Sequence, residues 1–113
     1  MTTSGAPDRF LRVTERIAYS AQKMRKQNLF DSERMFCDVY CFEPGQEQSA
    51  HSHAGSDKIY YVIEGTADVR IGDETRRLEA GEAAHAPPEV PHGVVNPGPG
   101  RLAVLVFMAP KPK

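Results

Sequence analysis

The sequence predicts an all-β fold, either a β-sandwich or a closed barrel, and three observations support this class. Short apolar segments rich in β-branched and aromatic residues follow one another from residue 35 to residue 109. Turn-forming glycine and proline residues separate these segments, and the gaps leave no room for helices. The length of 113 residues fits one domain with a single hydrophobic core.

The first 34 residues are predicted to form an N-terminal arm that packs on the barrel. Residues 12–20 are compatible with an edge strand, and residues 20–30 lack glycine and proline, so we expect a short helix there with Ser20 as its cap. The barrel is assigned to residues 35–110. Its expected strands cover residues 35–43, 58–64, 66–71, 75–80, 82–86, 92–96 and 101–109.

Two of the expected strands, residues 35–43 and 58–64, carry apolar side chains on both faces. One face fills the barrel, so the other needs a cover from a second sheet, the arm or another subunit. We therefore expect a homodimer in which the arm crosses to the partner. Cys37 and Cys41 would lie about 13 Å apart on such a strand, too far for a disulfide, and are interpreted as small buried hydrophobic residues.

The charge balance argues against nucleic acid and membrane as partners. The formal net charge is −1, with 14 basic and 15 acidic residues, so no global field attracts polyanions. The basic excess in residues 8–26 lacks interleaved aromatic residues and is interpreted as a solvated face. The N-terminus has no apolar signal-peptide core, and the longest apolar run, residues 102–110, is too short to span a bilayer. A cytoplasmic location is expected.

Three of the four histidines form a pattern suited to metal binding. His51 and His53 are one residue apart, so on a strand their side chains point to the same face. His92 follows a proline-rich turn at the start of a later strand. Distant histidines that a β fold brings together are typical of three-ligand metal sites with open coordination positions.

The spacing around these histidines resembles the two motifs of the cupin superfamily, G-x5-H-x-H-x3,4-E-x6-G and G-x5-P-x-G-x2-H-x3-N. The first motif runs from Gly45 to Gly65, and the second runs from Gly81 through Pro87 to Asn96. The chain is similar to small single-domain bacterial cupins over roughly residues 35–108. This resemblance implies a double-stranded β-helix, also called a jelly-roll or cupin barrel. It also implies a divalent transition metal (Zn, Ni, Fe, Mn or Cu) held by His51, His53 and His92.

Two positions depart from the motifs. Glu89 replaces the turn glycine of the second motif, and Lys58 replaces the glutamate ligand of the first. A protonated lysine has no lone pair for a metal and repels one. Three interpretations of Lys58 remain: a solvated surface residue beside Asp57, a strand bulge that turns Asp57 inward as a substitute ligand, or a functional cation that holds an anionic ligand near the metal.

Two further residues are candidates for the pocket. Tyr60 is expected to fill the barrel, with the alternative that its hydroxyl donates to a bound ligand. His85 lies among small residues in the strand that leads into the second motif. It is interpreted as outward-facing or structural, with pocket-lining residue and fourth metal ligand as alternatives.

Three functions remain open from the sequence. The first is a small metalloenzyme, such as a dioxygenase, isomerase or lyase, that acts on an organic acid, carbonyl or phenolic compound. The second is a module that binds a small molecule without chemistry, with or without metal; the ligand would be anionic if Lys58 is the functional cation described above. The third is a structural or regulatory protein. The barrel fold alone does not distinguish these functions, because it serves many of them.

Overall fold

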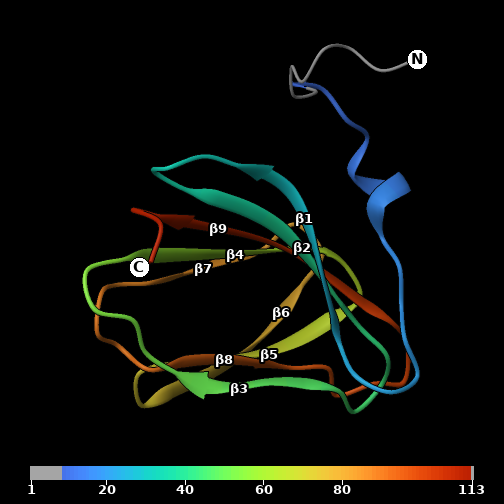
Figure 1. Cartoon of the computed structure of the whole chain (residues 1–113). Coiled ribbons are helices and arrows are strands. Elements are labelled where there is room, and N and C mark those ends of the chain that lie inside the picture. The colour runs from blue at the N-terminus through green and yellow to red at the C-terminus, as the bar shows by residue number, and fades with distance from the viewer. Residues whose placement is uncertain (1–8, 113) are drawn as a thin grey trace.

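The computed structural model describes residues 9–112, in which nine strands form two facing antiparallel sheets (Figure 1). One sheet has the strand order β1-β2-β9-β4-β7 and the other has the order β3-β8-β5-β6. This arrangement confirms the predicted all-β jelly-roll class. The strands are β1 (Arg25–Asp31), β2 (Phe36–Phe42), β3 (Glu47–His51), β4 (Asp57–Glu64), β5 (Thr66–Ile71), β6 (Glu74–Glu79), β7 (Ala83–Ala86), β8 (His92–Val95) and β9 (Leu102–Ala109).

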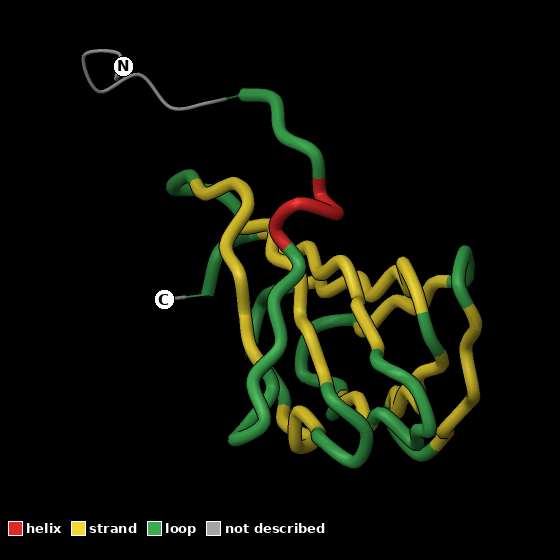
Figure 2. Tube along the Cα trace, turned by 90° about the vertical axis from the view of Figure 1, so that its right-hand side faces the viewer, coloured by secondary structure: helices red, strands yellow, loops and turns green. Residues whose placement is uncertain are grey.

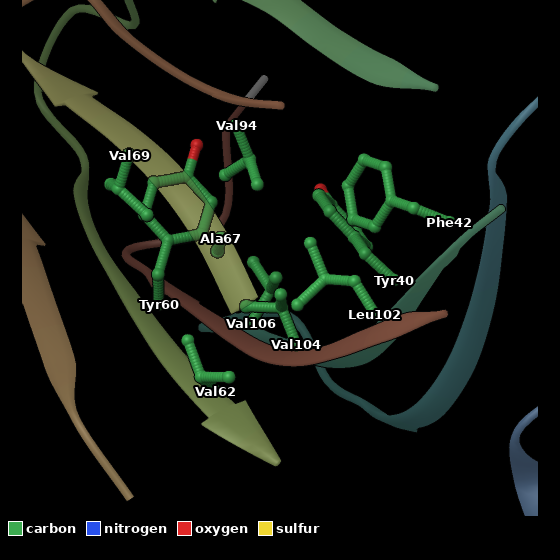
Figure 3. Packing of buried hydrophobic residues seen from close by; sticks show 10 residues of the cluster. All are labelled: Tyr40, Phe42, Tyr60, Val62, Ala67, Val69, Val94, Leu102, Val104 and Val106. Atoms are coloured by element: carbon green, nitrogen blue, oxygen red, sulfur yellow. The ribbon is translucent and has the colours of Figure 1, made fainter. Parts of the chain in front are cut away.

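The hydrophobic core lies between the two sheets and follows the alternation of each strand. In β4, Tyr60 and Val62 are fully buried, whereas Tyr61 between them is 41% exposed on the outer face. Inward residues of both sheets interdigitate in the barrel (Figure 3). The side chains of this cluster are Tyr40, Phe42, Tyr60, Val62, Ala67, Val69, Val94, Leu102, Val104 and Val106.

The arm runs along the outer face of the five-stranded sheet before it enters β1 (Figure 2). The side chains of Leu11, Val13, Ile17 and Tyr19 pack against a second buried cluster of Leu29, Val39, Cys41 and Ala103. Both cysteines are free, as expected. Within residues 9–112, no helix is long and apolar enough to cross a membrane.

The two local predictions for the arm are wrong in position. The helix expected in residues 20–30 is absent, and a short 3-10 helix, η1 (Val13–Arg16), lies where an edge strand was expected. The edge strand is β1, Arg25–Asp31, which pairs with β2 from Arg25↔Cys41 to Asp31↔Phe36. Backbone pairing with β2 and the burial of Leu29 outweigh the local helix propensity of this segment.

Part of the outer face remains uncovered beyond the arm. Tyr61 and Phe107 are 41% and 40% exposed there. The homodimer stays a prediction, and this surface is where we place its interface. Light scattering at micromolar concentration would test it: Phe107→Glu should convert a dimer to a monomer, and a monomeric wild-type protein would contradict the prediction.

Gly65, which closes the first motif, joins β4 of one sheet to β5 of the other. Its φ of +87° lies in the left-handed region, and a Cβ atom at this position would collide with the carbonyl oxygen of Arg101. The close approach of these two backbone segments therefore requires glycine.

Candidate metal centre

The three predicted ligands converge at one end of the barrel. His51 is the last residue of β3 and lies opposite His92, the first residue of β8, in the pairing of these strands. His53 follows β3 in the next loop. The ring centroids are 4.6 Å apart for His51 and His92 and 4.7 Å apart for His51 and His53. One nitrogen from each ring lies within 4.8 Å of the other two, which is compatible with a shared metal ion.

Backbone carbonyl groups orient two of the rings. His51 Nδ1 lies 2.8 Å from the carbonyl oxygen of Ser49, and His92 Nδ1 lies 2.9 Å from that of Val90. A carbonyl oxygen only accepts hydrogen bonds, so Nδ1 carries the proton and Nε2 keeps its lone pair in the neutral ring. His92 Nε2 is buried without a hydrogen-bond partner among the described residues. These features fit a metal ligand whose second nitrogen is fixed by the protein.

The surroundings of His53 and His92 favour the neutral form of these two rings. Burial lowers the pKa of His92 to about 4, and Lys58 and the other two histidines contribute to this shift. Burial also lowers the pKa of His53, with smaller contributions from His51 and Lys58. Neutral imidazole is the form that binds metals, so these two rings are prepared for ligation at neutral pH.

Glu89 takes the backbone conformation that its motif position demands. Its φ is +69°, in the left-handed region where glycine is favoured. Its backbone N–H donates a 2.8 Å hydrogen bond to the carbonyl oxygen of His53. The turn of the second motif thus holds the histidine loop of the first, with a non-glycine residue in a left-handed conformation.

Lys58 lies inside the barrel, so its interpretation as a solvated surface residue is wrong. The residue is 1% exposed, and its Nζ atom lies 5.3 Å and 5.2 Å from the ring centroids of Tyr40 and Tyr60. The pKa of Lys58 is lowered to about 8, chiefly by burial and to a smaller extent by the charge of Lys26, while Asp38 opposes the shift. At neutral pH the site therefore contains a buried cation.

Asp57 and His85 lie outside the barrel, which excludes both as additional ligands of the cluster. Lys58 pairs regularly with Ala86 and Met108, so no bulge turns Asp57 inward. Instead, Asp57 Oδ1 lies 2.7 Å from His85 Nε2, and both side chains are about half exposed. His85 lines a separate crevice of about 300 Å³ with residues of β5, β6 and β7.

Tyr60 is buried as expected, and its contact reveals a residue that sequence reasoning missed. The Tyr60 hydroxyl donates a 2.9 Å hydrogen bond to Gln48 Oε1. Gln48 is 8% exposed, and its Nε2 donor is buried without a partner in the described part of the chain. By simple alternation Gln48 and His51 would lie on opposite faces of β3, but a register shift between them turns both toward the site.

A cavity of about 500 Å³ adjoins the histidines. Lys26 of β1 also lines it, a role that was missed because the sequence predicted a helix in this segment. The cavity is lined by Lys26, Phe36, Tyr40, Gln48, Ser49, Ala50, His51, His53, Lys58, Met108 and Pro112.

The fold and the site together define a small jelly-roll barrel protein with a three-histidine cluster suited to a metal ion. The family model described as "Cupin domain" matches residues 38–108, which is more than half of the chain. The chain therefore belongs to the cupin family.

Solved structures and sequence relatives agree with this assignment. A Thermus thermophilus crystal structure is 44% identical with a TM-score of 0.89, covering 91% of this chain and 98% of that one. An uncharacterized Klebsiella pneumoniae protein with a double-stranded beta-helix domain is 28% identical with a TM-score of 0.85, covering 92% and 91%. The tetracenomycin polyketide synthase protein TcmJ of Streptomyces glaucescens is 37% identical over 73 residues, 62% of this chain and 49% of that protein. The chain thus spans about half the length of this relative.

Proposed function

We propose that the protein binds one divalent transition metal ion through His51, His53 and His92 and acts as a metalloenzyme on a small organic acid, carbonyl or phenolic compound. The observation that carries this proposal is the convergence of three imidazole rings, one of which has a buried nitrogen without a hydrogen-bond partner among the described residues. Imidazole ligands favour Zn, Cu, Fe or Ni over Mn.

The reaction classes that fit are those of a dioxygenase, isomerase or lyase. A metal held by His51, His53 and His92 would keep open coordination positions, and it would supply either polarisation of a carbonyl group or hydroxide near neutral pH. Around it, Lys58 offers a buried positive charge, and Tyr60 orients the amide of Gln48. The Streptomyces glaucescens relative is named as a polyketide synthase protein. Because polyketides are built from carbonyl units, this name favours a carbonyl or phenolic substrate here.

A second function, ligand binding without chemistry, is favoured by a different observation. No aspartate or glutamate is among the described residues that line the cavity. A general acid or base for proton transfer would then have to be a histidine, Lys58 or a tyrosine. A protein that only binds its ligand needs none of these.

Metal analysis tests the proposal directly. Protein purified without chelator should contain close to one metal ion per chain, and His51→Ala combined with His53→Ala should abolish retention while the melting curve changes little. His85→Ala is the matched control, because this exposed histidine lies outside the cluster. Equal metal content in the double variant and the wild type would refute the metal site. An enzyme would further turn over carbonyl or phenolic substrates only when metal-loaded, whereas a binding protein would release them unchanged.

A further inference from the structure

The cavity beside the histidines presents hydrogen-bond donors without matching acceptors. Lys58 is 1% exposed, lines the cavity, and makes no hydrogen bond to another residue of the described chain. Gln48 Nε2 is buried and has no hydrogen-bond partner among the described residues, and the Oε1 atom of the same amide accepts from Tyr60. Burying such donors is costly unless something accepts from them.

Lys26 adds a second positive charge at the rim. Its Nζ atom lies 5.2 Å from the centroid of the Tyr40 ring, which Lys58 also approaches at 5.3 Å. The nearest counter-charge is Asp38, whose Oδ1 already accepts a 2.8 Å hydrogen bond from Asn28. Asp38 does not line the cavity, and no ion pair joins it to Lys58 within residues 9–112. The cavity is therefore electropositive before any metal binds.

The remaining wall is apolar. Phe36 and Met108 line the cavity with the ring of Tyr40, and Pro112 completes this side. A pocket with an apolar wall and a few convergent polar groups is typical of a small-molecule site in which the polar groups fix the orientation. The chemistry of this lining matches a ligand with an anionic end and an apolar body.

We propose that the cavity binds a small carboxylate, with its charged group on Lys58 and Gln48 Nε2 and its apolar or aromatic body against Phe36 and Met108. This assignment rests on the proposed function only in one respect: the reaction of the bound carboxylate would require the metal. The carboxylate end is recognised by the chain itself and does not need the metal. The lysine that replaces the glutamate of the family motif thus exchanges a metal-binding charge for a ligand-binding charge.

The test compares benzoate with its neutral isostere benzamide by isothermal titration calorimetry, on metal-stripped and on zinc-loaded full-length protein. We expect benzoate to bind both forms, and benzamide to bind about tenfold more weakly or worse, since a charge-assisted hydrogen bond contributes about 1.5–3 kcal/mol. Lys58→Met should reduce benzoate affinity about tenfold and leave benzamide affinity unchanged. Lys23→Met, at an exposed lysine of the arm away from this cavity, should change neither.

The outcomes separate this inference from the proposed function. If the protein retains no metal but binds benzoate in a Lys58-dependent way, the carboxylate site stands and the metalloenzyme does not. If metal binds but benzoate and benzamide do not differ, or Lys58→Met leaves benzoate affinity unchanged, the carboxylate site is refuted. Gln48→Leu provides a second test in a variant that keeps Lys58, and it should weaken benzoate binding. If this variant binds benzoate with the affinity of the wild type, Gln48 does not contact the carboxylate.

Discussion

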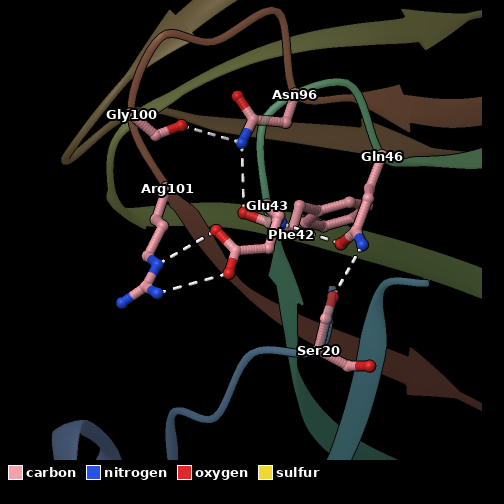
Figure 4. A network of polar contacts seen from close by, with 7 residues as sticks. All are labelled: Ser20, Phe42, Glu43, Gln46, Asn96, Gly100 and Arg101. Carbon is pink, nitrogen blue, oxygen red and sulfur yellow. Dashed lines mark hydrogen bonds and ion pairs between the residues drawn. The ribbon is translucent and has the colours of Figure 1, made fainter. Parts of the chain in front are cut away.

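The two ends of the barrel treat buried polar groups in opposite ways. At the end away from the histidines, Asn96 is 1% exposed, and both polar atoms of its side chain form hydrogen bonds. Figure 4 shows the two bonds that its Nδ2 donates. Its Nδ2 donates to the carbonyl oxygens of Phe42 and Gly100 at 3.1 Å and 2.9 Å, and its Oδ1 accepts from Gly98 N at 2.8 Å. At the histidine end, the buried Nε2 atoms of His92 and Gln48 have no described partner.

Strand β8 connects these two ends, because His92 begins it and Asn96 follows its last residue. Both residues belong to the same sequence motif and both are buried, yet their hydrogen bonding differs. A buried polar side chain that is fully satisfied stabilises the fold, whereas one left unsatisfied costs free energy and remains available for a ligand. The contrast separates motif residues that build the barrel from those that serve its site.

The largest expected change in stability follows from a substitution at Asn96, at the end of the barrel where the buried polar side chain is fully hydrogen-bonded. Asn96→Ala removes three hydrogen bonds and leaves two carbonyl groups and one amide of the chain without this partner. The free energy of unfolding should fall by about 3 kcal/mol, measured by urea denaturation. Metal content should not change in the folded fraction. A loss of metal without a loss of stability would contradict the division between the two ends.

The next largest change in stability, an increase, is expected at the histidine end, where buried polar groups lack hydrogen-bond partners among the described residues. Lys58→Met replaces a buried charge by an apolar side chain of similar shape, so the free energy of unfolding of metal-free protein should rise by roughly 2 kcal/mol at pH 7. The pKa of Lys58 falls from 10.5 to about 8 on folding. The unfolded wild type therefore binds more protons between these values, and its stability rises with pH in this window.

The gain from Lys58→Met should accordingly shrink as the pH rises from about 8 toward 10.5, and urea denaturation at several pH values measures it. A gain that is constant with pH would show that packing, and not the charge, causes it. The titratable groups around Lys58 whose state enters this comparison are Lys26, Asp38, Tyr40, His53, Tyr60 and His92.

A smaller effect should follow when Lys58 is changed to the residue that the family motif has. Lys58→Glu supplies a carboxylate near the three imidazoles, so metal affinity should rise by about tenfold, measured by competition with a chelator. Benzoate binding should weaken in the same variant because of charge repulsion. Lys26→Glu, at the exposed rim, is the control and should affect metal affinity less. Unchanged metal and benzoate affinities in Lys58→Glu would place Lys58 outside the functional site.

The smallest effect concerns the turn that holds His53. Glu89→Gly relieves a left-handed conformation at φ +69°. The strain relief of about 1–2 kcal/mol is partly offset by the flexibility of glycine in the unfolded chain, so the net gain should be about 0.5–1 kcal/mol. A shift of the thermal midpoint would report it. A decrease in stability would mean that the Glu89 side chain makes a compensating interaction.

The sequence predicted the barrel and the histidine cluster because both depend on local spacing. Alternation along β4 places Lys58 and Tyr60 on one face, and motif spacing places His51 and His92 at the ends of paired strands. Properties that depend on distant pairing were missed. The strand β1 forms only against β2, and the register shift that turns Gln48 inward is visible only in the pairing with β8.

The burial of Lys58 also differs from one of the interpretations made from the sequence, which placed this side chain at the solvated surface. Charged side chains are seldom fully buried, so a surface position was a reasonable interpretation. The barrel instead places this ammonium between two aromatic rings. Tyr60 belongs to the same strand as Lys58, but Tyr40 comes from β2, so the sequence around residue 58 alone does not indicate that the lysine is enclosed.

The walls of the ligand cavity come partly from outside the segment that the family shares. The match to the cupin family covers residues 38–108, which includes the three histidines and Lys58. Lys26 and Phe36 precede this segment, and Pro112 follows it. The cavity is therefore built jointly by the segment that matches the family model and by residues on both sides of it. Substitutions at Lys26, Phe36 or Pro112 would therefore change the shape and charge of this cavity without altering the three histidines.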